Sequence, residues 1–213
     1  MTRPERLVLV AGTATDIGKT WVGGQVLSLL HQAGTTVAAR KPAQSADADD
    51  PGPSDAAVLA AATGEAVEAV CPPHRWYTVA MAPPMAADAL GLAVPTLADL
   101  VAELTWPDGD PVQVGWVETV GGPRSPIGAD GDAVDLAAAI DPDLVLLVAD
   151  AGLGTVNSVR LGVDVFAPRR VVVFLNRYDA GDDLHRRNLD WLQTRERLEV
   201  VVDLEALSNL VAG

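Results

Sequence analysis

A glycine-bounded loop near the start of the chain constrains the possible folds more than any other feature of this sequence. A short apolar run, residues 7–11, leads into residues 12–20, Gly-Thr-Ala-Thr-Asp-Ile-Gly-Lys-Thr, and a predicted helix follows. Backbone N–H groups at a helix N-terminus have no partner within the helix, so a strand, such a loop and a helix together form a site for an anion. We predict a phosphate-binding loop, in which Lys19 reaches the β and γ phosphates of a nucleotide and Thr20 binds Mg²⁺.

The loop departs from the strict phosphate-loop pattern in its length. Five residues rather than four separate Gly12 from Gly18, so the backbone must follow a different path. The position five residues before Lys19 is Ala14, where the ATPases that partition DNA carry an additional lysine, and this excludes that class. The alternative is a glycine-terminated strand followed by an ordinary helix that begins with Lys and Thr.

Lysine is rare in this chain, which makes its second lysine informative. Of the 15 basic residues 13 are arginine, and the two lysines are Lys19 and Lys41. Lysine presents a compact charge and arginine a wide planar fork, so lysine kept at two places suggests a need for a point charge there. Lys41 follows the predicted strand 37–39, and the carboxyl ends of parallel strands share one edge of a sheet. We expect Lys41 beside the loop, although a solvated surface lysine is the alternative.

Short apolar runs alternate with stretches long enough for helices, and this pattern predicts the fold class. Several runs are continuously β-branched, which is typical of strands buried on both faces. The prediction is an α/β, P-loop nucleotide-binding fold with a single domain over residues 1–213, in which helices cover both faces of a mostly parallel sheet. The predicted strands are 7–11, 37–39, 112–117, 144–149, 171–175 and 200–202, and the predicted helices are 19–33, 55–63 and 184–197.

Two acidic residues are candidates for binding a metal ion beside the loop. Glu118 follows the predicted strand 112–117 and precedes the pair Gly121-Gly122, where backbone can approach a ligand. Mg²⁺ is usually held by one or two carboxylates together with substrate phosphates, and Glu118 fits that role. Asp55 is the second candidate, although an ordinary carboxylate at the start of a helix is equally compatible with its position.

Two more strand ends carry groups suited to a ligand. A glycine-containing turn and a helix start, with Gly154, Thr155 and Asn157, follow the strand 144–149, and their free N–H groups could hold an anion such as a carboxylate. Asn176 ends the strand 171–175, and its amide presents both a donor and an acceptor, which match the edge of adenine. A turn-forming asparagine is the alternative for Asn176.

Charge and composition exclude several kinds of partner. With 29 acidic and 15 basic side chains the formal net charge is −14, so we expect neither a nucleic acid nor a membrane surface to bind. No apolar run approaches the roughly 20 residues that cross a bilayer, and no signal peptide is recognisable, so a cytoplasmic protein is predicted. The one cysteine, Cys71, cannot form an internal disulfide and is expected to be a buried or idle thiol.

Taken together, these residues resemble the dethiobiotin synthetase family, ATP-dependent enzymes that close the ureido ring in biotin synthesis. The resemblance covers nearly the whole chain and is weakest around residues 82–88 and in the C-terminal tail. The matching motifs are the elongated loop 12–20, Lys41-Pro42-x-Gln44-Ser45, Asp55, Glu118-x-x-Gly121-Gly122, Gly154-Thr155-Val156-Asn157 and Asn176-Arg177.

The resemblance implies an ATP- and Mg²⁺-dependent cyclo-ligase that forms a homodimer. In the reaction of this family an amine of 7,8-diaminononanoate captures CO₂ as a carbamate, which attacks the γ-phosphate of ATP. The second amine then closes the resulting mixed anhydride into the ring. Every intermediate is anionic, so positioned cations are the main requirement.

The resemblance also implies a role for each matched residue. The catalytic cations are Lys19 and Lys41, and the Mg²⁺ ligands are Thr20, Asp55 and Glu118. The nucleotide-binding residues are Gly12, Thr15, Asp16, Ile17, Gly18, Lys19, Thr20 and, at adenine, Asn176. The diamine-binding residues are Thr15, Lys41, Ser45 and Gly121, and the substrate carboxylate is held by Gly154, Thr155 and Asn157 of the opposite subunit.

The sequence departs from the family pattern in three places. Thr119 and Val120 replace two small residues in the turn after Glu118, where their side chains could crowd the diamine. Ser158 stands where relatives often have histidine, and residues 203–207 replace an acidic, proline-bearing segment that contributes adenine contacts.

Two other functions compete with this interpretation. An ATP-dependent amidoligase of the cobyrinic acid diamide synthetase type shares the fold and the style of loop. Such enzymes normally carry a glutamine-hydrolysing domain with a nucleophilic cysteine, for which this chain has neither the length nor a suitable thiol. A non-catalytic ATP-binding protein is the second alternative, and Thr119 and Val120 are its best support.

Overall fold

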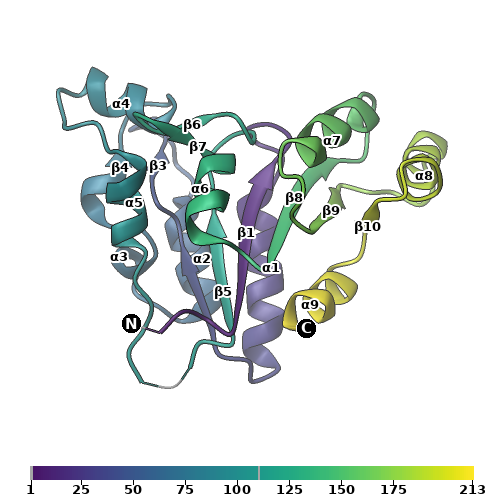
Figure 1. Cartoon of the computed structure of the whole chain (residues 1–213), viewed down its shortest axis with the longest axis horizontal. Coiled ribbons are helices and arrows are strands. Elements are labelled where there is room, and N and C mark those ends of the chain that lie inside the picture. The colour runs from purple at the N-terminus through teal and green to yellow at the C-terminus, as the bar shows by residue number, and fades with distance from the viewer. Residues whose placement is uncertain (1, 110) are drawn as a thin grey trace.

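A parallel sheet forms the centre of the protein. The structure is a computed structural model that describes residues 2–109 and 111–213. Within these residues a six-stranded sheet has the order β2-β5-β1-β8-β9-β10, with every pairing parallel (Figure 1). Its strands are β1 (Arg6–Gly12), β2 (Val37–Arg40), β5 (Val114–Glu118), β8 (Leu144–Asp150), β9 (Val171–Asn176) and β10 (Glu199–Val201). All six match predicted strands, with ends shifted by at most two residues.

Helices cover both faces of the sheet, as predicted. Alternate residues of β1 point to opposite faces: Val8 and Val10 pack with α1, α2 and α9, whereas Leu7 and Leu9 pack with α5, α6 and α7. Burial on both faces explains the continuous apolar runs in the sequence. The helices are α1 (Lys19–Gln32), α2 (Asp55–Thr63), α3 (Val67–Val70), α4 (Pro83–Ala89), α5 (Leu97–Glu103), α6 (Ala133–Ile140), α7 (Thr155–Asp164), α8 (Asp183–Asp190) and α9 (Leu204–Ala212).

One predicted helix consists of two elements. The segment 184–197 contains most of α8, which ends at Asp190, and a π-helical turn, Trp191–Arg195. The two other predicted helices correspond to α1 and α2, and α2 has the predicted bounds. Ser54 caps α2, since its side chain accepts a hydrogen bond from the Ala57 N–H, and Gly64 ends it with φ +78°.

Two small sheets lie outside the central one. The first pairs β3 (Gln44–Ser45) with β4 (Trp76–Tyr77), and the second pairs β6 (Pro126–Gly128) with β7 (Gly131–Asp132). A 3₁₀ turn, Pro73–Arg75, precedes β4. Figure 1 shows α4 and these short strands together at one end of the molecule, beyond the carboxyl ends of β2 and β5. They give the proline-rich stretch 72–90 a structure that the sequence pattern did not predict.

Cys71 is buried, as expected. Burial raises the pKa of its thiol to about 12, so the reactive thiolate does not form near neutral pH. A buried, protonated thiol cannot serve as the nucleophile that the amidoligase alternative requires. No helix in the described part of the chain is long and apolar enough to cross a membrane.

Candidate functional site

The carboxyl ends of three neighbouring strands bring the candidate catalytic residues together. In the register of the sheet, Val10 of β1 pairs with Glu118 at the end of β5, and Val117 pairs with Arg40 at the end of β2. The phosphate loop follows β1, and Lys41 follows β2 directly. The prediction that Lys41 emerges beside the loop is therefore confirmed.

A compact cluster of four polar side chains forms at this edge. Lys41 Nζ lies 2.5 Å from Asp55 Oδ2 and 2.7 Å from Glu118 Oε1. The Thr20 hydroxyl lies 2.8 Å from Asp55 Oδ1 and 2.7 Å from Glu118 Oε1. Because a hydroxyl carries one proton, it donates to one of these carboxylates at a time. Glu118 Oε2 is buried and has no hydrogen-bond partner among the described residues, so this oxygen can still accept a hydrogen bond or bind a cation.

The structure resolves the local ambiguity at Asp55. Ser54 is the capping residue, and Asp55 is the first residue of α2, with its carboxylate turned to Lys41 and Thr20. Gln44 Oε1 accepts a hydrogen bond of 3.0 Å from the Ala56 N–H and ties the start of α2 to β3. The Asp55 carboxylate thus interacts with Lys41 and Thr20, whereas Ser54 caps the helix.

The charges of Lys41 and Asp55 depend on each other. Burial alone would lower the pKa of Lys41, but Glu118 and Asp55 outweigh it and raise that pKa above its ordinary value. Burial alone would raise the pKa of Asp55, but the Lys41 ammonium lowers it below its ordinary value. Lys41 is therefore a permanent cation, and Asp55 a carboxylate, near neutral pH.

Lys19 is buried and has no ion-pair partner among residues 2–109 and 111–213. Burial and the nearby charge of Lys41 lower the pKa of Lys19. Its Nζ donates a hydrogen bond of 3.2 Å to the Gly121 carbonyl, and no carboxylate of the described residues lies within ion-pair distance. A buried charge is costly unless it is paired, so Lys19 is arranged to receive an anion.

The phosphate loop can adopt its path only because of two glycines. Gly18 has φ +92°, and a Cβ there would lie 2.2 Å from Asn176 Nδ2. A Cβ on Gly12 would lie 2.7 Å from Ile17 Cγ2. Asn176 Nδ2 in turn donates a hydrogen bond of 2.9 Å to the Ile17 carbonyl. Asn176 therefore shapes the loop as well as facing the space beside it.

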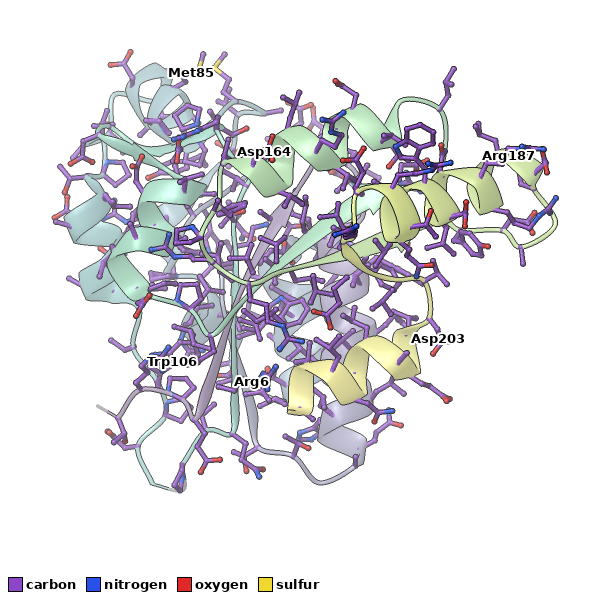
Figure 2. The ribbon with its side chains drawn as sticks, turned by 45° about the vertical axis from the view of Figure 1, so that its right-hand side comes forward. Arg6, Met85, Trp106, Asp164, Arg187 and Asp203 are labelled. Atoms are coloured by element: carbon purple, nitrogen blue, oxygen red, sulfur yellow. The ribbon has the colours of Figure 1, made fainter. Side chains whose placement is uncertain are left out.

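A cavity of about 750 Å³ adjoins the loop. It is lined by the start of α1, the end of β9 and the connection from β10 to α9, with Gly18, Trp21, Asn176, Asp203 and Glu205 among its residues. Asp203 lies at the start of α9 (Figure 2). A space of this size, continuous with a phosphate loop, suits the base and sugar of a nucleotide.

Known proteins with similar sequences decide the family. A family model described as an AAA domain matches residues 6–212. The ATP-dependent dethiobiotin synthetase BioD of Rhodococcus jostii is 39% identical over 212 residues, which cover 97% of this chain and 89% of that protein. The chain belongs to the dethiobiotin synthetase family. A second member, from Caulobacter vibrioides, is 37% identical over 214 residues and is covered to 95% of its length.

Structural similarity confirms the predicted fold. A plasmid partition protein from Borrelia burgdorferi superimposes with a TM-score of 0.56, and the match covers 99% of this chain and 97% of that one. Its sequence identity is 11%, so the similarity shows the α/β fold alone. The membership in the dethiobiotin synthetase family rests on the sequence relatives.

Of the two unusual residues of this family member, Thr119 lies in the core and Val120 is half-buried against it. Thr119 is fully buried, and its hydroxyl donates a hydrogen bond of 2.9 Å to the Val10 carbonyl. Val120 packs against the apolar cluster that contains Val117 and Ala11. Thr119 therefore points into the protein and away from a substrate, whereas the expectation that Val120 crowds the diamine stays a prediction.

Three predicted diamine-binding residues have contrasting surroundings. Gly121 has φ +56°, and a Cβ there would lie 3.6 Å from Thr15 Oγ1, so these two residues are close neighbours beside Lys19. The Ser45 hydroxyl instead donates a hydrogen bond of 2.6 Å to the Met81 carbonyl, next to α4. No direct contact joins Ser45 to the Lys41 cluster in the described structure.

The start of α7 lies apart from the Lys41 cluster. Gly154 caps α7 with φ +91°, the Thr155 hydroxyl is buried without a described partner, and Asn157 is exposed. Within one chain the structure shows no contact between these described residues and Lys41. Their predicted action on the substrate of an opposite subunit stays a prediction.

Sequence reasoning missed several residues at the site. Gln44 positions α2, and its place in the Lys41-Pro42-x-Gln44-Ser45 motif was an available signal. Trp21 and residues 203–205 line the cavity, although no local pattern marks them. Arg177 donates hydrogen bonds to the phosphate loop and to Asp150, a pairing that no spacing rule predicts.

Proposed function

We propose that this chain is an ATP-dependent dethiobiotin synthetase that makes dethiobiotin from 7,8-diaminononanoate and CO₂. The observation that carries the proposal is the arrangement beside the phosphate loop of three buried residues, Lys19, Lys41 and Glu118, with the half-buried Asp55. Similarity to dethiobiotin synthetases over 97% of the chain supports the substrate assignment. The site provides fixed positive charge where a phosphoryl group is transferred.

The reaction consists of three steps that all involve anions. One amine adds to CO₂ and loses a proton to give a carbamate. A carbamate oxygen then bonds to the γ-phosphorus of ATP, and the bond from that phosphorus to ADP breaks. The second amine attacks the carbonyl carbon of the mixed anhydride, closes the ring and releases phosphate. Preorganised cations lower the barrier because negative charge shifts between oxygens in every step.

The two lysines have different tasks in this proposal. Lys19 has no counter-ion in the described structure and neutralises the phosphates of ATP. Lys41 is buried and is kept charged by Asp55 and Glu118. We assign Lys41 to the carbamate and the transferring phosphoryl group, and Gly121 and Thr15 to the substrate amine beside them.

The donor atoms of the cluster fit Mg²⁺. Asp55, Glu118 and Thr20 offer hard oxygen ligands, and the unpartnered Glu118 Oε2 is the kind of buried atom that a cation satisfies. No group of three or more His, Cys, Asp or Glu side chains gathers as a metal site in the described ranges. When bound, Mg²⁺ would neutralise charge on the triphosphate.

The cavity beside Gly18 is the proposed site of the base. Because the Asn176 amide nitrogen donates to Ile17, its oxygen remains as the acceptor for a ligand. An acceptor at this position matches the exocyclic amino group of adenine. Residues 203–205 line the same cavity and take the place of the family segment that this sequence lacks.

A homodimer would complete the substrate site. The start of α7 offers an anion the helix dipole and the Thr155 hydroxyl, which has no partner in the described structure, and we assign Gly154, Thr155 and Asn157 to the substrate carboxylate. Leu153 is 92% exposed and Leu161 61% exposed on the same region of the surface. Apolar side chains this exposed support contact with a second copy.

Phosphate release tests the proposed function. With ATP and Mg²⁺ present, we expect release only when both diaminononanoate and bicarbonate are added, together with a product of the mass of dethiobiotin. Omitting either substrate should reduce the rate to background, because no carbamate forms. Tight ATP binding without turnover under any of these conditions would contradict the proposal and identify a non-catalytic protein.

A further inference from the structure

Two consecutive residues at the end of β9 hold two consecutive carbonyls of the phosphate loop. Asn176 Nδ2 donates a hydrogen bond of 2.9 Å to the Ile17 carbonyl, and Arg177 Nη2 donates one of 2.9 Å to the Asp16 carbonyl. The loop is thus fastened from one side by a neighbouring strand. Asn176 belongs to the predicted nucleotide site, whereas Arg177 has no role in the function described above.

Fastening a carbonyl also aims an N–H group. In a planar trans peptide the N–H of the next residue points opposite to the carbonyl. The Ile17 N–H is therefore directed away from Arg177, and the Gly18 N–H away from Asn176. These are N–H groups of the loop that precedes Lys19, where a phosphate is received.

The backbone at this contact is held in an unusual conformation on both sides. Asp16 has φ +58° and Arg177 has φ +56°, values in the left-handed region that residues other than glycine rarely adopt. Such conformations persist where surrounding contacts determine them, and they gather at functional sites. The contact between Arg177 and the Asp16 carbonyl joins the two strained residues directly.

Arg177 is itself anchored by a third element. Its Nη1 lies 2.9 Å from Asp150 Oδ2 at the end of β8, and Asp150 Oδ1 accepts a hydrogen bond of 2.9 Å from the Gly152 N–H. The side chains of Arg177 and Asp150 are 58% and 40% exposed. An ion pair this exposed adds little to the stability of the fold, so its value lies in orientation.

We propose that Arg177 is a positioning residue for phosphate binding, which Asp150 anchors so that its guanidinium fixes the Asp16 peptide and aims the Ile17 N–H at the nucleotide. The inference rests on the proposed nucleotide site. It concerns the shape of the loop before ATP arrives, and it assigns Asp150 an indirect part in ATP affinity.

Two single substitutions separate positioning from simple charge attraction. Arg177→Gln removes a positive charge near the phosphates, and Asp150→Asn removes a negative one. Positioning predicts that both weaken ATP binding by about tenfold, since an asparagine amide at position 150 must turn its NH₂ group toward either Gly152 N–H or Arg177. Simple charge attraction predicts weaker binding for Arg177→Gln and tighter binding for Asp150→Asn. Calorimetric titration with ATP and Mg²⁺ measures both.

A conservative variant and a double variant sharpen the result. Arg177→Lys keeps the charge but cannot reach Asp150 and the Asp16 carbonyl together, so we expect it to bind ATP as weakly as Arg177→Gln. The double variant Asp150→Asn/Arg177→Gln should bind no more weakly than either single one. The turnover number at saturating ATP should stay within about twofold of the wild type, because neither residue touches the reacting atoms.

An exposed ion pair between an arginine and an aspartate of α8 provides the matched control. Arg187 lies 2.6 Å from Asp183 on α8 at the outer edge of the molecule (Figure 2), and Arg187→Gln and Asp183→Asn change the same charges. ATP affinity should not change in either. Unchanged or tighter ATP binding in Asp150→Asn, or wild-type ATP binding in Arg177→Lys, would overturn this inference and would leave the proposed function intact. Absence of ATP binding in the wild type would instead overturn the proposed function and this inference with it.

Discussion

Replacing Lys41 with glutamine is expected to lower turnover by about a thousandfold while ATP affinity stays within about an order of magnitude of the wild type. Lys41 Nζ is held between Asp55 and Glu118, and in our proposal the carbamate and the γ-phosphate meet beside it. Loss of one preorganised group that stabilises developing charge costs about 10²–10³ in turnover, and a full charge belongs at the upper end of that range. Phosphate release and calorimetric titration with ATP measure the two quantities separately.

Folding must be checked in this variant because Lys41 is buried. Its removal leaves Glu118 buried without its counter-ion, and such a change costs about 3 kcal/mol of stability. Circular dichroism and thermal unfolding show whether the variant is folded at the assay temperature. Arg170→Gln is a matched control, since Arg170 is half exposed at the amino end of β9 and pairs with Glu199. Unchanged turnover in a folded Lys41→Gln protein would remove Lys41 from the mechanism.

Replacing Lys19 with alanine should, unlike the Lys41 substitution, weaken the binding of ATP itself. Lys19 is buried beside the loop, its pKa is lowered by burial and by Lys41, and its only described polar partner is the Gly121 carbonyl. Removing one side of a buried charge pair between protein and ligand typically costs about 2–5 kcal/mol, so we expect ATP binding to weaken by at least about thirtyfold. Titration with ATP and Mg²⁺ measures the loss.

The stability of Lys19→Ala gives an independent check. Because Lys19 has no ion-pair partner in the described structure, its removal relieves an unpaired buried charge, and the variant should unfold at or above the wild-type temperature. The Lys41→Gln protein is its natural control, since it loses the same charge from the same site and keeps ATP affinity. Retained ATP binding in Lys19→Ala would contradict the assignment of the phosphate loop.

The parallel topology explains how much of the site the sequence predicted. Once the apolar runs are assigned as parallel strands, the residues that follow them must meet at one edge, and Lys41, Glu118 and the loop do so. Asp55 remained ambiguous because its local sequence fits an ordinary first turn of a helix. Its contacts with Lys41 and Thr20, which are distant in sequence, decided between the alternatives.

The other parts of the fold and of the site depended on contacts between residues far apart in the sequence, which leave no local pattern. The strands β3 and β4 have two residues each, too short for a period to be visible, and they pair across thirty residues of chain. The orientation of Thr119 follows from its hydrogen bond to the Val10 carbonyl. The residue types in the turn after Glu118 could not predict that bond. The pairing of Asp150 with Arg177 likewise joins two strand ends through side chains alone.

A crystal structure with a non-hydrolysable ATP analogue and Mg²⁺ tests the central claim most directly. Two ammonium groups, that of Lys19 at the start of α1 and that of Lys41 after β2, are claimed to act on one triphosphate. We expect Nζ of both Lys19 and Lys41 within about 3.5 Å of phosphate oxygens, and the base in the cavity beside Asn176. A nucleotide bound elsewhere, or either ammonium directed into solvent, would contradict the account.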